Sequence, residues 1–187
     1  EVTQLSLYLK LLEDATMMDA HQFGLFKETI LPDLKQNIVC GNSLVGRDIA
    51  EGSLFSNVDE TKLKPMNFED VFPKVMKRGG FNAVVGNPPY VVLSKDELEE
   101  SLGSYLSNRY SVFQYKADLY HLFIEKAIGL LREQGMLGYI TPNTWYTLQF
   151  TSKLREYVLE HTKVDELLIF NHRVFGDAAV DAAVCIL

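Results

Sequence analysis

The feature that most constrains this chain is a short apolar run followed by two consecutive prolines. The run, Phe81 to Val85, is too short for a helix, ends in β-branched residues and lies between glycines. This pattern predicts a strand that is buried on both faces. Asn87-Pro88-Pro89-Tyr90 follows directly after Gly86. Because proline fixes its own φ and keeps the preceding residue out of the helical region, we expect a rigid, extended polar tip.

The polar tip offers two hydrogen-bond acceptors beside an aromatic ring. The Asn87 carboxamide oxygen and the Pro88 carbonyl oxygen can face one point, where each accepts one hydrogen of an exocyclic amino group. Tyr90 can stack on the planar base that carries this group. The two oxygens also favour the positive charge that develops on the nitrogen as it attacks an electrophile, so no general base is required. The alternative is a proline-stiffened loop after a core strand.

Asn-Pro-Pro-Tyr at the end of a strand resembles the catalytic motif of S-adenosylmethionine-dependent amino-methyltransferases. The match is to the adenine-N6 DNA methyltransferases of bacterial restriction-modification systems in particular. Phe68 to Pro73, and the glycine pair that leads into the strand, resemble the bifunctional restriction-methylase type; Asn82 departs from it where aspartate is common. The resemblance implies that Asn87, Pro88 and Tyr90 are catalytic and that S-adenosylmethionine is the cofactor.

The same resemblance implies three further site residues. Asn42 follows a predicted strand, Asn37 to Gly41, and would contact the adenine of the cofactor; the alternative is an asparagine that caps a turn. Leu119 would pack beside the cofactor, or in the core. Phe175, in the turn before the last strand, would stack on the target base opposite Tyr90, the alternative being a phenylalanine that shields the turn from solvent.

The remaining apolar patterns alternate between helices and strands. Helices are predicted from Val2 to about Asp14, from Lys95 to about Ser107, from the Asp118 cap to a stop at Gly135, and from Phe150 to His161; further strands are predicted at Met136–Ile140, Val164–Phe170 and Ala178–Leu187. This alternation indicates an α/β domain in three layers, αβα. The resemblance implies a partial Rossmann-like methyltransferase fold, with a mostly parallel sheet and an antiparallel closing strand.

Two parts of the cofactor site expected of this fold do not occur before Asn37. They are a glycine-rich turn after a first strand and an acidic residue after a second. Residues 1–187 are therefore predicted to be a single domain and a fragment of a catalytic domain, without its first two strands and its glycine-rich loop. We expect the isolated fragment to be inactive, and its uncovered sheet edge beside the Phe81 strand offers a route to a homodimer.

The composition bears on the partners. A net charge of −7 argues against the chain gripping a phosphate backbone unaided. Double-stranded DNA with a flipped adenine is the predicted partner, held by a recognition domain outside this chain. An aromatic and basic cluster from Arg109 to Lys116 could line a nucleic-acid channel or anchor a loop.

The cysteine and histidine patterns indicate neither a disulfide nor a metal. Cys40 and Cys185 lie in apolar runs without paired spacing, which predicts reduced core thiols in a cytoplasmic protein. The four histidines show no ligand spacing, so no metal is predicted. There is no signal peptide and no transmembrane run, so no membrane partner is expected.

The predicted function is adenine-N6 DNA methylation in a restriction-modification enzyme, with transfer of a methyl group from S-adenosylmethionine to a flipped adenine. Two alternatives remain open. The same tetrapeptide serves methyltransferases that act on an RNA base or on a protein glutamine. The second alternative is a non-catalytic DNA-binding or scaffolding module with a vestigial site.

Overall fold

The computed structural model describes residues 2–13, 34, 36–50, 60–93, 100–114, 116–170, 174 and 181–187. The chain divides into two compact units, Glu1–Cys40 and Gly41–Leu187. The first unit contains helix α1, Val2–Glu13, which confirms the helix predicted there. Among the described residues, no helix is both long and apolar enough to cross a membrane.

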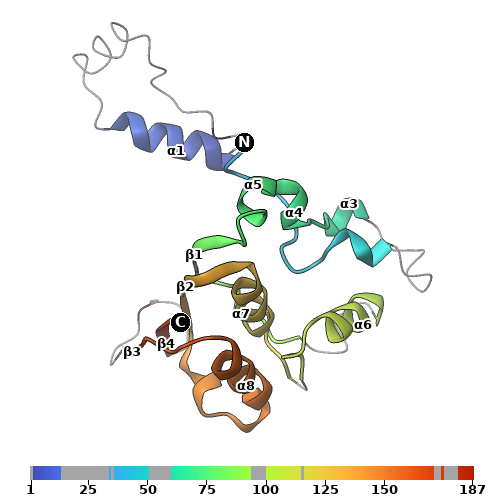
Figure 1. The fold of residues 1–187 in the computed structure, drawn as a ribbon, viewed down its shortest axis with the longest axis vertical. Coiled ribbons are helices and arrows are strands. Elements are labelled where there is room, and N and C mark those ends of the chain that lie inside the picture. The colour runs from blue at the N-terminus through green and yellow to red at the C-terminus, as the bar shows by residue number, and fades with distance from the viewer. Residues whose placement is uncertain are drawn as a thin grey trace, which may run out of the picture. The chain divides into compact units, whose positions relative to one another are not determined.

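The second unit is built on a four-stranded sheet with the order β1-β2-β4-β3 (Figure 1). The strands are β1 Phe81–Gly86, β2 Leu131–Pro142, β3 Glu166–Ile169 and β4 Ala182–Ile186. β1 and β2 are parallel, whereas β4 is antiparallel to both β2 and β3. Three strands therefore share one direction and the last strand runs against them. The α/β prediction with a reversed closing strand is confirmed, in a mixed sheet.

β1 is not buried on both faces, contrary to the prediction. It is an edge strand of the described sheet, and Val85 is 83% exposed. Asn82 and Ala83 are exposed as well. The apolar run forms a strand because its backbone pairs with β2. Within the described part of the chain, no second strand pairs with the other edge of β1. An uncovered edge beside this strand was predicted, and its use in a homodimer stays a prediction.

Helix α7, Leu119–Leu130, begins where the sequence predicts. The Asp118 side chain accepts from the Tyr120 N–H, and the His121 ring accepts from the Asp118 N–H, a reciprocal capping box. The helix does not extend to Gly135, because β2 begins at Leu131, which already pairs with Phe81. A Cβ at Gly135 would lie 2.9 Å from the Phe81 carbonyl oxygen. This glycine therefore permits a close backbone approach in β2 and does not end a helix.

The other predicted elements are confirmed in part. Helix α8, Ser152–His161, and strand β3 lie within their predicted ranges. Helix α6 is described over Glu100–Arg109 and ends two residues beyond the predicted end near Ser107; its predicted start at Lys95 lies outside the described residues. Short helical turns complete the described elements: η1 Arg47–Ala50, α3 Glu60–Leu63, α4 Phe68–Val71, α5 Pro73–Met76, η2 Asn143–Tyr146 and η3 Gln149–Thr151.

The strand predicted at Asn37 to Gly41 does not form. Residues 38–41 have no strand partner among the described residues, and Asn42 makes only an isolated bridge to Pro65. Cys40 is consequently exposed, so the prediction that it is a core thiol is wrong. An apolar run becomes a strand only when another strand accepts its hydrogen bonds.

The core of the second unit contains residues of the sheet, of helices α6, α7 and α8, and of the segment 44–49. Its fully buried residues include Leu122 and Ile124 of α7, Leu137 of β2 and Leu154 of α8. Cys185 of β4 is buried and free, which confirms the prediction for this thiol. This packing fixes the strand ends from which the candidate site projects.

Candidate active site

The Asn-Pro-Pro-Tyr tip follows directly on the carboxyl end of β1. Asn87 is exposed, Pro88 is buried and Tyr90 is half-buried. A Cβ at Gly86 would lie 3.1 Å from the ring of Tyr139 on β2. The glycine therefore allows the chain to pass close to β2 as it enters the tip.

The Tyr90 hydroxyl connects the tip to β2. Its oxygen lies 2.8 Å from the Asn87 Oδ1 atom and 3.0 Å from the Ile140 carbonyl oxygen, both acceptors for its proton. The Tyr90 ring packs edge-on against Tyr120, with ring centroids 6.0 Å apart. Burial raises the pKa of Tyr90, so the hydroxyl keeps its proton at neutral pH. Two of the three predicted catalytic residues are thus in direct contact.

The residues after the tip are fastened to the start of α7. The Val91 N–H donates to the Asp118 carboxylate at 2.7 Å, and the Leu119 N–H donates to the Val91 carbonyl at 2.9 Å. Burial raises the pKa of Asp118, and its hydrogen bonds from backbone N–H groups oppose that rise. The cap of α7 therefore also holds the end of the tip, a second use of Asp118 that its sequence pattern does not reveal.

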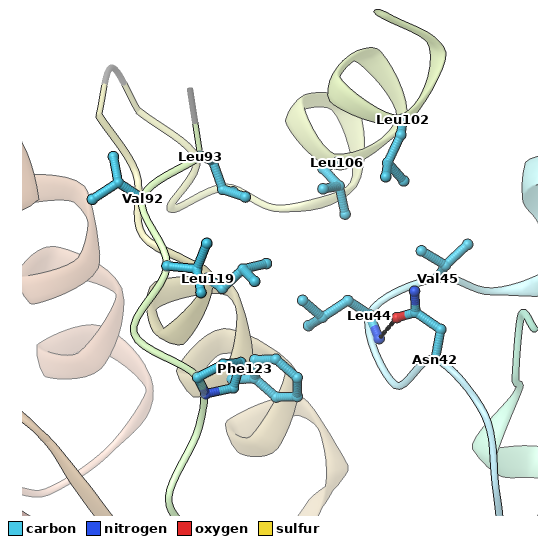
Figure 2. A pocket seen from close by; sticks show the side chains of 11 residues that line it. Asn42, Leu44, Val45, Val92, Leu93, Leu102, Leu106, Leu119 and Phe123 are labelled. Carbon is cyan, nitrogen blue, oxygen red and sulfur yellow. Dashed lines mark hydrogen bonds between the residues drawn. The ribbon is translucent and has the colours of Figure 1, made fainter. Parts of the chain in front are cut away.

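A cavity of about 400 Å³ lies beside this junction. Figure 2 shows Asn42, Leu44 and Val45 on one side, with Val92, Leu93 and side chains of α6 and α7 around the rest of the space. Its lining is apolar except for one carboxamide: Asn42, Leu44, Val45, Pro89, Val91, Val92, Leu93, Leu102, Leu106, Leu119 and Phe123. Both residues predicted to contact the cofactor thus line one cavity, together with Pro89 of the tip.

The Asn42 side chain has two roles in this geometry. Its Oδ1 atom accepts the Leu44 N–H at 3.1 Å, which is the turn-capping alternative considered for this residue. The same side chain lines the cavity. The hydrogen bond fixes the carboxamide in one orientation, so capping the turn and lining the cavity are compatible.

Two tyrosines hold the segment of residues 42–50, of which Asn42, Leu44 and Val45 line the cavity. The Tyr110 hydroxyl donates to the Leu44 carbonyl at 2.8 Å. The Tyr105 hydroxyl donates to Asp48 at 2.8 Å and accepts the Gly46 N–H at 2.9 Å. Burial raises the pKa of both phenols. Tyr110 thus anchors a loop, the second of the two roles considered for the aromatic and basic cluster.

Two residues that line the cavity, Leu102 and Leu106, were not singled out from the sequence. Their spacing of four residues in a helix puts them on one face, which is the only signal that the sequence offers. Phe175 lies outside the described residues, so its stacking on a base opposite Tyr90 stays a prediction. Within the described ranges, no group of three or more histidine, cysteine, aspartate or glutamate side chains could hold a metal ion.

The fold has a counterpart among solved structures. The chain is similar to the protein in a cryo-EM structure of the DrdV–DNA complex, with a TM-score of 0.50 and 18% identity over 81% of this chain and 17% of that one. At this identity the likeness concerns the fold alone.

By its family match, the chain is of the restriction-modification methylase class. More particularly, the chain belongs to the Eco57I restriction-modification methylase family, whose profile matches residues 1–175. The family predicted from the Asn-Pro-Pro-Tyr tip and its lead-in is therefore confirmed.

Two relatives illustrate the match. The type II restriction enzyme and methyltransferase RM.Eco57I of Escherichia coli is 33% identical over 174 residues, which are 90% of this chain and 16% of the relative. The adenine-specific methyltransferase PglX of Streptomyces coelicolor is 28% identical over 139 residues, which are 67% of this chain and 11% of the relative. The chain thus spans less than a fifth of either relative.

Proposed function

We propose that this chain carries the amino-group site of an adenine-N6 DNA methyltransferase of a restriction-modification system. The observation that carries the proposal is the Asn87–Tyr90 contact at the end of β1, beside the cavity that Asn42, Pro89 and Leu119 line. Family membership supports it, as do the names of relatives described as adenine-specific or as restriction enzyme and methyltransferase.

The chemistry assigned to the tip is orientation and charge stabilisation. The Asn87 side-chain oxygen and the Pro88 carbonyl oxygen would each accept one hydrogen of the adenine amino group, which directs the nitrogen lone pair at the methyl carbon. When a bound sulfonium donor gives up its methyl group and leaves as a neutral thioether, the amino nitrogen would become positive, and the two fixed dipoles of Asn87 and Pro88 would stabilise that charge. One proton then leaves the nitrogen for solvent.

The methylase family implies S-adenosylmethionine, which supplies an electrophilic methyl group when bound. A volume of about 400 Å³ is in the range of small-molecule sites. Apolar walls and one carboxamide suit a flat ring such as adenine, and Asn42 and Leu119 would hold it. Among the described lining residues no carboxylate is available for ribose hydroxyls, so the fit concerns the ring end of the cofactor.

Binding of the whole cofactor also requires parts of the fold beyond this cavity. We propose a three-layer, Rossmann-like domain whose first two strands and glycine-rich loop belong to the protein outside these residues. They would bind the ribose and the amino-acid end of the cofactor. The isolated fragment is then expected to be inactive, although its site for the amino group is present.

DNA binding is proposed to depend on a recognition domain outside this chain, because the chain itself has a net charge of −7. The flipped adenine would lie on Tyr90, whose hydroxyl is fixed by hydrogen bonds. Stacking contributes about 1–3 kcal/mol per base. Phe175 would cover the opposite face of the adenine.

The test is Asn87→Ala in the full-length protein, with Asn82→Ala as the matched control on the exposed side of β1. We expect the rate of methyl incorporation into duplex DNA from radiolabelled S-adenosylmethionine to fall about a hundredfold or more in Asn87→Ala. Cofactor affinity, measured by equilibrium dialysis, should change less than twofold. Asn82→Ala should behave as the wild type.

An unchanged rate in Asn87→Ala would refute the assignment. Wild-type methylation of RNA or of a protein glutamine, and not of DNA, would favour another acceptor. If the wild-type protein binds DNA but methylates none of these substrates, the site is vestigial.

A further inference from the structure

The Tyr90 hydroxyl has one proton and two carbonyl oxygens within hydrogen-bonding distance. The Asn87 Oδ1 atom is at 2.8 Å and the Ile140 carbonyl oxygen, on β2, is at 3.0 Å. A phenol donates a single hydrogen but can also accept hydrogen bonds through its lone pairs. The single proton of Tyr90 therefore cannot satisfy both carbonyl oxygens fully. The Tyr90 oxygen, in turn, accepts no hydrogen bond from Asn87 or Ile140.

The proposed reaction needs the same Asn87 oxygen for the substrate amino group. While Tyr90 donates to that oxygen, the hydroxyl competes with the incoming amino hydrogen. A half-turn of the carboxamide about its last side-chain bond exchanges its NH₂ group and its oxygen. This torsion is broad and roughly two-fold in asparagine, and Asn87 is exposed, so packing leaves room for the turn.

After the turn, each of these groups has a partner. The Asn87 NH₂ group donates to the Tyr90 oxygen, the Tyr90 O–H donates to the Ile140 carbonyl, and the Asn87 oxygen faces away from Tyr90. This series of hydrogen bonds then ends at the Ile140 carbonyl of β2. The pairing of β2 with β1 and β4 fixes the position of that carbonyl. Burial raises the pKa of Tyr90, so the hydroxyl keeps the proton that this series of hydrogen bonds requires.

We propose that the Tyr90 hydroxyl is a positioning group for the Asn87 carboxamide, which turns when an amino group arrives, so that its NH₂ donates to Tyr90 and its oxygen accepts from the substrate. This inference rests on the proposed function and adds a role for the hydroxyl that is separate from stacking by the ring. The Tyr90 ring would stack in either state, because its edge contact with Tyr120 does not involve the carboxamide.

The test is Tyr90→Phe in the full-length protein, which keeps the ring and removes only the hydroxyl. We expect kcat for DNA methylation to fall about tenfold, the worth of one hydrogen bond, with the KM for DNA within about twofold of the wild-type value. The fluorescence of 2-aminopurine placed at the target position should be unchanged, because base stacking is kept. Tyr120→Phe is the matched control; it removes a hydroxyl beside the same ring and should leave kcat within twofold.

A double-mutant cycle distinguishes positioning from a general structural role. In the Asn87→Ala background there is no carboxamide to position, so Tyr90→Phe should lower kcat by less than twofold there. A hydroxyl that only stabilises the fold would lower kcat by the same factor in both backgrounds. If Tyr90→Phe does not fold, 4-fluorophenylalanine at position 90, a ring of nearly the same size without a hydroxyl, should show the same loss.

The outcomes separate the two proposals. A wild-type protein that methylates no adenine refutes the proposed function and this inference with it. A wild-type protein that methylates adenine, with an equally active Tyr90→Phe variant or with equal losses in both backgrounds, overturns the inference and leaves the Asn87 assignment intact.

Discussion

The stability of this protein should fall between neutral pH and about pH 4 because of one buried histidine. His121 is 3% exposed, and its Nδ1 atom accepts the Asp118 N–H at 3.1 Å. The ring proton is therefore on Nε2, which is buried and finds no partner among the described residues. A second proton would charge the buried ring and remove the capping hydrogen bond. Burial accordingly lowers the pKa of His121 to about 4.

The direction and size of this change in the free energy of unfolding follow from the difference in proton binding between the folded and unfolded states. The unfolded histidine has a pKa of 6.5, so between pH 6.5 and 4 the unfolded state binds more protons than the folded state. The free energy of unfolding then decreases as the pH falls, by about 2 kcal/mol at pH 5 and about 3 kcal/mol at pH 4 relative to pH 7. Above pH 6.5 both states carry a neutral ring, and the contribution is constant.

The matched variant is His121→Gln, because glutamine at this helix position can accept the same Asp118 N–H in a capping box. Urea unfolding can be followed by the emission of Trp145, the only tryptophan of the chain and 3% exposed. We expect the stability difference between wild type and variant to shift by about 2 kcal/mol between pH 7 and pH 5. Other groups, Asp118 included, titrate in both proteins and cancel. Equal pH profiles for wild type and His121→Gln would refute the reasoning.

Further predictions concern backbone space and a buried hydroxyl. Gly80→Ala should destabilise the fold by roughly 3 kcal/mol, because φ is +124° and the new Cβ would lie 2.4 Å from the Leu130 carbonyl oxygen. Gly129→Ala, in α7, should stabilise it by about 1 kcal/mol, because a new Cβ there would meet no atom within 4 Å apart from its chain neighbours and the backbone of its own helix; thermal unfolding compares the two. Tyr110→Phe should cost about 1–2 kcal/mol in urea unfolding, because the Leu44 carbonyl loses its donor. Equal stability of the two glycine variants, or of Tyr110→Phe and wild type, would contradict these expectations.

Features that depend on neighbouring residues in the chain could be predicted from the sequence. Asp118 caps α7 where the pattern places the cap, because the helix N–H that the cap satisfies, that of Tyr120, lies only two residues away. Helix α8 follows its apolar spacing, with Leu154 and Val158 buried. The tip follows directly on the end of β1, since the glycine and the two prolines limit the backbone there. The family was predicted from the residues of this tip, and the match over residues 1–175 confirms it.

Features that need a distant partner could not be predicted from the sequence. The apolar run at Asn37 to Gly41 resembles the β1 run in composition, yet of the two only β1 pairs with a strand among the described residues. The prediction that β1 is buried on both faces was also wrong, because burial depends on which distant parts of the chain cover each face of a strand. The end of α7 at Leu130 is set by the pairing of Leu131 with Phe81 across the sheet.

The sequence by itself determined the family, the polar tip and the cap of α7, because short-range backbone restrictions are properties of the residues alone. Only the tertiary structure decided that Asn42 and Leu119 line one cavity and that the Tyr90 hydroxyl reaches the Ile140 carbonyl, 50 positions along the chain. A hydrogen bond forms only when its two atoms come within about 3 Å. Strand order sets that distance, and it arises from the packing of the whole sheet.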